Sequence, residues 1–367
     1  MPLLQPAADI YLNRLIHNYH VIQEIAGNAN IMAVIKANAY GHGAVPVARV
    51  LSDEGVHGFC VALASEAMEL INAGIQEPIL HLGRISNSNL ELYKSGQVRC
   101  TINTIENVKE LAKIGTPNSP VFVHLKIDTG MGRMGVRFED SESILKSLMD
   151  IPAIRVEGVY SHFATAEEND TQYRDLQLDQ FQKVVKLAKD ILPETKYFHI
   201  ANSAGILNCP DSHYNMVRPG ISLYGVSPLG KPHDKLNPVM KMKAKVVLVK
   251  KMKAGESVGY NRLYTAQKDE NIALLQAGYA DGIPVVFSNS GSVEIKGAQY
   301  PIAGKVSMDL VAVRCEDGNI SDNDEAVFWG GDHENTRLEY LAIKYGKIPY
   351  EFLTGVSARV ARNLINE

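Results

Sequence analysis

The chain has 367 residues, of which 46% are hydrophobic and 21% charged, and its formal net charge is −4. This share of apolar residues excludes a largely disordered chain, and the slight acidic excess argues against binding to nucleic acid. There is no apolar stretch of membrane-spanning length and no secretory signal at the N-terminus, so the sequence predicts a cytoplasmic protein that is not bound to a membrane.

The first part of the chain, to about residue 225, alternates short apolar runs with longer amphipathic stretches. The short runs predict strands at 31–36, 57–62, 78–83, 99–102, 121–128, 156–163, 197–202 and 214–219. Helical patterns lie between them, including 88–96 and 172–192. Eight strands separated by helices predict a (β/α)8 barrel of the TIM type, with an open doubly wound sheet as the alternative.

The pattern changes after a segment rich in proline and glycine, which includes Pro228, Gly230 and Pro238 and marks a linker. Short alternating segments with glycine-rich turns follow and predict antiparallel strands. The segments 336–346 and 349–365 return to a helical pattern. We therefore expect a barrel at 1–234 and a mainly antiparallel β domain at 235–367. The first ten residues or so are expected to pack with the β domain.

Residues suited to cofactor chemistry lie at the ends of the predicted barrel strands. Lys36 ends the first apolar run, where lost hydration should lower its pKa from about 10.4 and favour Schiff-base chemistry. A lysine whose ammonium reaches water is the alternative for this residue alone. Ser203 follows the seventh strand and Gly220 the eighth, where barrels often hold a phosphate. A reactive lysine and a phosphate site together suggest pyridoxal 5′-phosphate.

Seven segments in order along the chain resemble motifs of the alanine racemase family. They are VIKANAYGHG (34–43), HLKIDTGMGRMG (124–135), YSHFATA (160–166), HIANSAG (199–205), RPGISLYG (218–225), GYADG (278–282) and GKVSMD (304–309). The resemblance covers essentially the whole chain. It implies a pyridoxal-phosphate enzyme that interconverts L-alanine and D-alanine and supplies D-alanine for peptidoglycan.

Racemisation requires two acid/base groups on opposite faces of a planar carbanion. The resemblance implies that Lys36 holds the cofactor and serves the D-alanine face, and that Tyr260 serves the L-alanine face. His162 and Arg218 match family residues near that tyrosine. Arg218 also matches an arginine that faces the pyridine nitrogen of the cofactor.

The resemblance implies further ligands for the cofactor phosphate, namely Tyr40, Ser203, Tyr350 and the backbone of Gly220 and Ile221. Arg133 and Met308 match contacts to the substrate carboxylate, and Lys126 matches a lysine that is often carbamylated. Asp309 and Tyr279 lie in matching motifs as supporting residues. The family analogy implies a homodimer in which Tyr260 and Met308 reach the partner's active site.

Three positions depart from the family pattern and leave substrate selectivity open. Asn261 follows Tyr260 where glycine is usual, Ser307 replaces a frequent cysteine, and Leu310 replaces a frequent glutamine. A pyridoxal-phosphate decarboxylase and a non-catalytic cofactor-binding protein are the rival interpretations. The β domain with Tyr260 argues against the second. We expect no metal site and no disulfide, because the four cysteines show no paired spacing.

Overall fold

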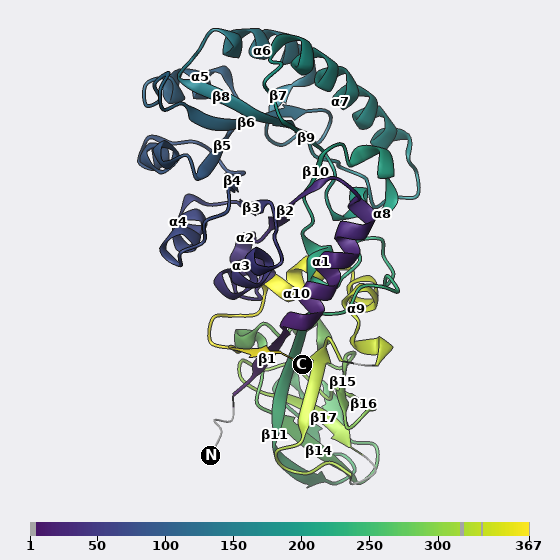
Figure 1. Cartoon of the computed structure of the whole chain (residues 1–367). Helices are drawn as coiled ribbons and strands as arrows, with labels where there is room; N and C mark the ends of the chain where they lie inside the picture. Colours follow the sequence, from purple (N-terminus) through teal and green to yellow (C-terminus); the bar gives the residue numbers. More distant parts are fainter. Residues whose placement is uncertain (1–4, 316–318, 332, 367) are drawn as a thin grey trace. The chain divides into compact units, whose positions relative to one another are not determined.

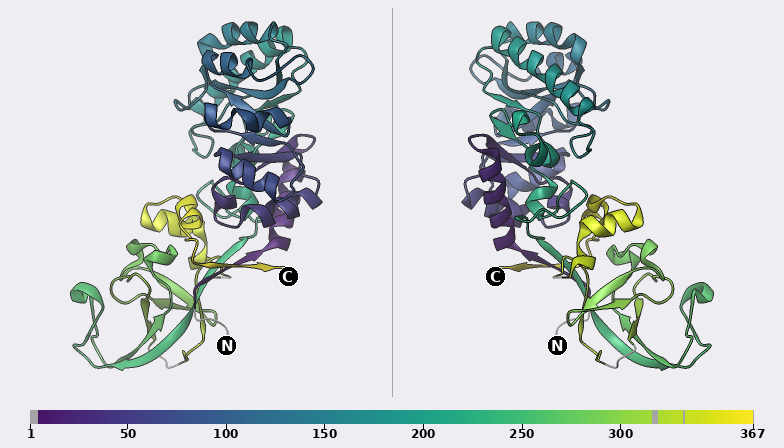
Figure 2. Two further views of the ribbon diagram at one scale, coloured as in Figure 1. Left: turned by 90° about the vertical axis from the view of Figure 1, so that its left-hand side faces the viewer. Right: turned by 90° about the vertical axis from the view of Figure 1, so that its right-hand side faces the viewer.

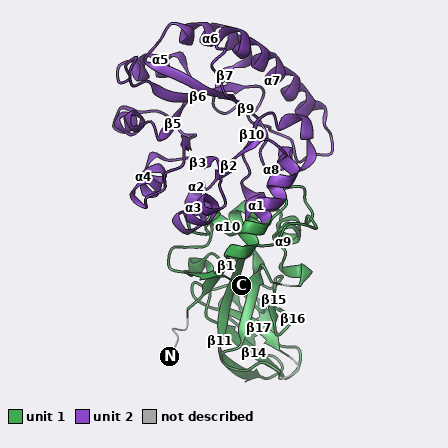
Figure 3. Ribbon diagram, in the orientation of Figure 1, with its two compact units in different colours: residues 1–17, 40–43, 224–367 green, residues 18–39, 44–223 purple. Residues whose placement is uncertain are grey.

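The computed structural model describes residues 5–315, 319–331 and 333–366. The chain divides into two compact units (Figure 3). Unit 1 comprises residues 1–17, 40–43 and 224–367, and unit 2 comprises residues 18–39 and 44–223. Among the described residues, none of the helices has the length and hydrophobicity needed to cross a bilayer.

Unit 2 is built on a parallel sheet with the strand order β10-β2-β3-β4-β5-β6-β8-β9. The described strands of this path are β2 (Asn30–Val34), β3 (Gly58–Val61), β4 (Ile79–His81), β5 (Val98–Ile102), β6 (Val121–Asp128), β8 (Ile154–Tyr160), β9 (Tyr197–His199) and β10 (Met216–Val217), and the short β7 (Val136–Arg137) pairs with β6. Beyond β9 and β10, the N–H of Arg218 donates to the carbonyl of Ala201 at 3.0 Å, which joins the two ends of the sheet. The predicted barrel is confirmed, and the open-sheet alternative is wrong.

Helices cover the outer side of these strands (Figures 1 and 2). They are α3 (Ala44–Asp53), α4 (Ala64–Asn72), α5 (Ile105–Leu111), α6 (Ser141–Met149), α7 (Gln172–Ile191) and α8 (Ser203–Asn208), while α1 (Leu12–Ala26) precedes β2. In α7 the buried residues Phe181, Val184, Val185 and Ala188 recur every three or four positions. This spacing gives the helix one apolar face for the barrel.

The predicted helix at 88–96 is instead the 3-10 helix η1 (Asn87–Ser95). Its first turn is rich in serine and asparagine. Their side chains form hydrogen bonds to nearby backbone groups, and these bonds compete with the backbone hydrogen bonds of a regular α-helix. The side chain of Asn89 accepts the N–H of Ser86 at 2.8 Å. Local polar contacts therefore favour the tighter helix at this position.

Unit 1 contains a mainly antiparallel sheet organised around the long strand β11 (Met240–Met252), which is prominent in Figure 2. Buried and partly exposed residues alternate along most of β11, as expected for a strand with one face on a core. β11 pairs antiparallel with β1 (Ala7–Tyr11), β14 (Glu270–Leu275) and β18 (Glu325–Trp329). Strands β15 (Ser292–Ile295), β16 (Ala298–Pro301) and β17 (Val311–Cys315) belong to the same sheet, whereas β12 (Ser257–Val258) and β13 (Tyr264–Thr265) form a separate two-stranded sheet. The predicted antiparallel β architecture is confirmed.

The end of the chain differs from the predicted helix at 349–365. After α9 (Leu338–Tyr345), the helix α10 (Pro349–Thr354) stops at Gly355, and residues Ala361–Ile365 form β19, which pairs parallel with β1. The guanidinium of Arg362 donates to the carbonyls of Val356 and Val360 at 2.7 and 2.8 Å and stabilises the turn. The strand depends on a partner from the opposite end of the chain, which local sequence cannot reveal.

Gly225 and Gly230 offer a matched test of backbone strain in unit 1. Both have positive φ, +77° and +73°, but a Cβ on Gly225 would lie 1.7 Å from the carbonyl oxygen of Asn237, whereas one on Gly230 meets nothing within 4 Å. Gly225→Ala should lower the free energy of unfolding by about 3 kcal/mol or more, and Gly230→Ala by about 1 kcal/mol. Equal losses in urea titrations would contradict the close approach.

Candidate active site

Strands β2 and β10 bring two residues of the predicted cofactor site, Lys36 and Gly220, to the same edge of the barrel. They pair in parallel, with Met216 opposite Asn30, and the N–H of Val34 donates to the carbonyl of Pro219 at 2.9 Å. Lys36 follows this contact by two residues on one side, and Gly220 by one on the other. β2 ends at Val34, so Lys36 lies just beyond the strand, at the carboxyl edge where barrel enzymes place reactive groups.

Lys36 begins a turn with unusual backbone geometry. The next four residues, from Ala37 to Tyr40, all have φ between 52° and 54°, in the left-handed region that non-glycine residues avoid. Glu66 holds the start of this turn, because its carboxylate accepts the N–H groups of Ala37 at 2.6 Å, Ala62 at 2.8 Å and Leu63 at 3.0 Å. These bonds fix the direction in which the chain leaves Lys36.

The surroundings of Lys36 favour its neutral amine and carry positive charge. Burial, followed by the charge of Arg133, lowers the pKa of Lys36. Burial and the charges of Arg133 and Arg218 lower the pKa of Lys126 to about 8. The Nζ of Lys126 lies 5.7 Å from the centre of the Tyr160 ring. This edge of the barrel is therefore suited to ligands with negative charge.

Arg218 is buried and makes several hydrogen bonds at the end of β10. Its Nη1 donates to the Nδ1 of His199 at 2.5 Å, and its Nη2 donates to the carbonyls of Ser161 at 2.7 Å and Ile200 at 3.3 Å. Nη2 also lies 3.3 Å from the Nδ1 of His162. Burial, followed by the charge of Arg218, lowers the pKa of His162 well below its ordinary value, so this imidazole is neutral.

Hydroxyl and backbone N–H groups gather around Ser203 at the start of α8. Its Oγ accepts the N–H of Gly220 at 2.9 Å and that of Ser222 at 3.3 Å, and it bonds the Ser222 hydroxyl at 2.9 Å. Ile221 lies between Gly220 and Ser222 in the chain and begins the short helix η4 (Ile221–Tyr224). Clustered amides and hydroxyls after the last two barrel strands fit a phosphate group.

The remaining candidates belong to unit 1, where Tyr40 and Tyr350 lie together. Their ring centres are 5.7 Å apart, and the Tyr40 ring is 5.0 Å from that of Tyr224. Tyr350 is the second residue of α10, whose position is set by Pro349 at the first turn. Unit 1 thus brings together two tyrosines that are 310 positions apart in the sequence.

Tyr260 stands on a turn with its side chain 66% exposed. Gly259, Asn261 and Arg262 around it have φ of 69°, 59° and 50°. Asparagine is among the residues that best tolerate this region. Asn261 stands where the family pattern has glycine. Its positive φ lies in the left-handed region, which glycine favours.

The loop with Met308 and Asp309 is bound to the loop with Tyr279. The N–H of Tyr279 donates to the carbonyl of Ser307 at 3.0 Å. Arg359 joins the two loops through Asp281 at 2.6 Å and Asp309 at 2.5 Å. Met308 remains 51% exposed, so its loop is fixed while its side chain stays at the surface.

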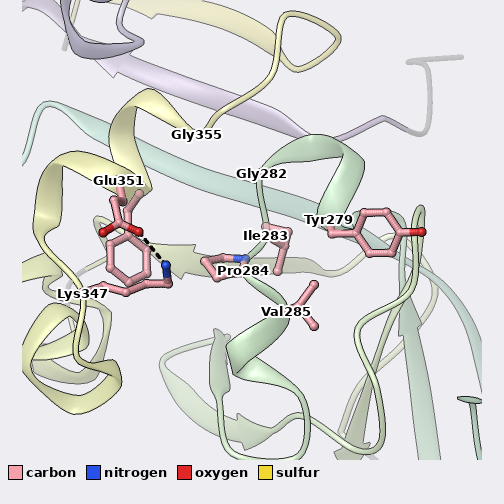
Figure 4. Close-up of a pocket in the computed structure, with 9 residues that line it drawn as sticks. Tyr279, Gly282, Ile283, Pro284, Val285, Lys347, Glu351 and Gly355 are labelled. Carbon is pink, nitrogen blue, oxygen red and sulfur yellow. Dashed lines mark hydrogen bonds and ion pairs between the residues drawn. The ribbon is translucent and has the colours of Figure 1, made fainter. Parts of the chain in front are cut away.

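Tyr279 also lines a pocket of about 270 Å³ in unit 1, opposite the ion pair of Lys347 and Glu351 (Figure 4). Its other lining residues are Gly282, Ile283, Pro284, Val285, Phe352 and Gly355. Tyr279 is the single predicted site residue in this set, so we do not assign the pocket to the candidate site. In the described part of the chain, no group of three or more histidine, cysteine or acidic residues could hold a metal ion.

Sequence reasoning missed three residues that hold the candidates in place. The roles of Glu66 and Arg359 could not be predicted from the sequence. Glu66 binds backbone N–H groups, and the aspartates paired with Arg359 are distant in the chain. His199 is the first residue of the segment HIANSAG, and the resemblance of that segment gives His199 no role of its own. Its contact with Arg218 depends on the pairing of neighbouring strands.

Comparison with known proteins gives matches along nearly the whole chain. The family described as alanine racemase, N-terminal domain, matches residues 10–228, and the one described as alanine racemase, C-terminal domain, matches residues 239–364. The alanine racemase of Carboxydothermus hydrogenoformans is 40% identical over 97% of this chain and 98% of its own length. That of Desulforamulus reducens is 39% identical over 97% of each.

Solved structures give the same result. The crystal structure of alanine racemase from D-cycloserine-producing Streptomyces lavendulae has a TM-score of 0.94 and 32% identity, and covers 100% of this chain and 98% of that one. The alanine racemase from E. faecalis has a TM-score of 0.90 and 33% identity, over 98% of both chains.

Glu66→Ala should remove the carboxylate that accepts three backbone N–H groups, including that of Ala37 in the turn after Lys36. We expect the free energy of unfolding to fall by about 1–3 kcal/mol. Glu69→Ala, on the exposed face of the same helix, is the control and should change it by less than about 0.5 kcal/mol. Equal losses for the two variants in urea titrations would show that the turn does not depend on Glu66.

Proposed function

Because the chain belongs to the alanine racemase family and interconverts L-alanine and D-alanine, we propose that Lys36 and Tyr260 are its acid/base groups and pyridoxal 5′-phosphate its cofactor. The pairing of β2 with β10 is the observation that carries the proposal. It sets a lysine of lowered pKa at the same edge as a buried arginine and the hydroxyl and N–H groups around Ser203, and this arrangement supports the proposal.

The residues of unit 2 fit this cofactor in their chemistry. The hydroxyl of Ser203 and the N–H groups of Gly220 and Ile221 would bind its phosphate, and Arg218 would donate to its ring nitrogen. The Nζ of Lys36 would hold it covalently as a Schiff base. When bound, the cofactor supplies an electron sink for the bond broken at Cα. Tyr40 and Tyr350, which lie together in unit 1, are proposed as further phosphate ligands through their phenol groups.

The two proton carriers act on opposite faces of the substrate. Tyr260 takes the α-proton of L-alanine, and Lys36 returns a proton from the other side to give D-alanine; the roles reverse in the other direction. The lowered pKa of Lys36 increases the share of amine that can accept a proton. Arg218 donates hydrogen bonds but keeps its proton, which limits electron withdrawal by the ring and favours proton return over transamination.

Positive charge near Lys36 would bind and orient the substrate carboxylate. Arg133 would pair with that carboxylate, and the backbone N–H of Met308 would donate to it. The pKa of Lys126, about 8, leaves part of its amine neutral. That amine can add carbon dioxide, losing one proton, to form an anionic carbamate able to pair with Arg133. Asp309 and Tyr279 would support the Met308 loop.

We propose a homodimer whose barrel domain, 1–234, holds the cofactor, and whose β domain, 235–367, supplies Tyr260 and Met308 to the partner's site. The exposure of these two side chains supports this. Loops near them expose further large apolar side chains, namely Leu263, Val285, Val286 and Leu310. Clustered apolar exposure is typical of protein interfaces. The D-alanine produced would serve peptidoglycan synthesis.

Lys36→Ala should abolish the yellow absorbance of bound cofactor and lower racemisation by about 1000-fold or more, because it removes both the covalent attachment and one proton carrier. Deuterium uptake at Cα of each alanine enantiomer in heavy water measures the loss. Lys109→Ala, an exposed lysine on α5, is the control and should leave both signals unchanged. Unchanged deuterium uptake in Lys36→Ala would exclude the proposed role.

Mixing Lys36→Ala with Tyr260→Phe tests the shared site. If Tyr260 acts across the interface, each mixed dimer contains one complete site, and equal mixing should restore about a quarter of wild-type activity. Either variant alone should remain inactive at the same concentration. Subunit exchange verified by differential tagging, with no recovery of activity, would place Tyr260 in the site of its own subunit.

A further inference from the structure

A line of polar side chains, buried except for the partly buried Arg99, extends from Arg218 through the barrel. It begins at Arg218 after β10 and passes through His199 on β9 and His124 on β6 to Glu157 on β8 and Arg99 on β5. His199 Nε2 lies 2.8 Å from His124 Nδ1, and Arg99 Nε donates to Glu157 Oε2 at 2.7 Å. Between them, His124 Nε2 is 4.0 Å from Glu157 Oε2.

The proton positions along this line follow from Arg218. A guanidinium has donors and no acceptor, so His199 Nδ1 must accept the bond from Nη1. A neutral His199 then carries its proton on Nε2 and donates to His124 Nδ1. His124 in turn carries its proton on Nε2, directed toward Glu157. The opposite arrangement would place an N–H of His199 against an N–H of Arg218.

Both histidines are neutral, as this order requires. Burial lowers the pKa of His124 to about 3, although the charge of Glu157 opposes the shift. Burial, followed by the charge of Arg218, lowers the pKa of His199 well below its ordinary value. Burial alone would raise the pKa of Glu157, but the hydrogen bond and charge of Arg99 bring it below its usual value. An ionised carboxylate therefore faces the Nε2–H of His124.

The backbone makes room for this arrangement at Gly158. A Cβ there would lie 2.6 Å from His124 Nδ1, the atom that accepts from His199. The pairing of β6 with β8 shifts register between Val123 and His124, at the same place. The ring of Tyr160 stacks on His199 with centres 4.9 Å apart and planes at 2°. Strand geometry and ring packing thus hold both imidazoles in line.

We propose that His124 is a positioning residue for Arg218: it accepts from His199 and so holds the His199 ring in the orientation in which its Nδ1 accepts from the guanidinium. The effect on racemisation rests on the proposed function, in which Arg218 faces the cofactor. Without His124, the Nε2–H of His199 is a buried donor lacking this acceptor. The His199 ring can then turn, and Arg218 loses one of its fixed acceptors.

Nitrogen-15 NMR of the histidines in the wild-type holoenzyme tests the proton order directly. We expect His199 and His124 both to be neutral with the proton on Nε2. A proton on Nδ1 of either residue would overturn the proposal, and this measurement requires no variant. It is also independent of turnover, so a wild type that binds no cofactor would refute the proposed function and not the proton order.

Two variants of His124 test its consequence. His124→Asn keeps an acceptor near the position of Nδ1 and should hold kcat within about threefold of wild type. His124→Leu removes the acceptor and should lower kcat by about 10-fold to 100-fold, change KM little, and give mixed tautomers of His199. The absorbance spectrum of the bound cofactor should shift in His124→Leu and not in His124→Asn.

His81→Leu is the matched control, because His81 is equally buried on β4 and bonds the Tyr93 hydroxyl at 2.8 Å, outside this line. It should keep kcat within about threefold and leave His199 with its proton on Nε2. If His124→Leu behaves like His81→Leu in both kcat and tautomer, His124 does not position Arg218. If His124→Asn loses as much kcat as His124→Leu, the lost acceptor is not the cause, and the proposal also fails.

Discussion

A buried guanidinium needs acceptors for its N–H groups, and this requirement organises the polar interior of the barrel. Arg218 obtains them from the carbonyls of Ser161 and Ile200, just after β8 and β9, and from the carbonyl and ring of His199 at the end of β9. The His199 carbonyl also accepts the N–H of Ser161 at 3.1 Å, whereas Ser161 and Ile200 lie beyond the last paired residues of their strands. The end of the sheet is thus both the point where the barrel closes and the point where a fixed cation is held.

The same edge combines two demands that usually conflict. A reactive lysine should be neutral, whereas a site for phosphate and carboxylate should be positive. Here burial is the main cause that lowers the pKa of Lys36 and of Lys126, and the cations act in the same direction: the charge of Arg133 adds to the shift of Lys36, and the charges of Arg133 and Arg218 add to that of Lys126. The positive charge that suits an anion therefore also favours the neutral amine.

The barrel could be predicted from sequence because each strand is a short apolar run bounded by turn signals, and β6 was predicted at its observed bounds, Val121–Asp128. Lys36 and Ser203 could be placed at strand ends for the same reason. β19 could not, because it exists through β1, more than 340 residues away. Glu66, which holds the turn after Lys36, was missed because it binds backbone N–H groups, which no side-chain pattern records.

Both proposed proton carriers lie next to strained backbone, and this follows from what they must do. The left-handed run from Ala37 to Tyr40 follows Lys36, and left-handed residues flank Tyr260 on both sides. Such conformations persist only where neighbouring contacts hold them, and in return they fix the direction of the adjacent side chain. Glu66 provides such contacts for Lys36 within unit 2. Around Tyr260, glycine and asparagine limit the cost of the turn instead. Each carrier is therefore oriented by its own unit, so a change near one of them should leave the other in place.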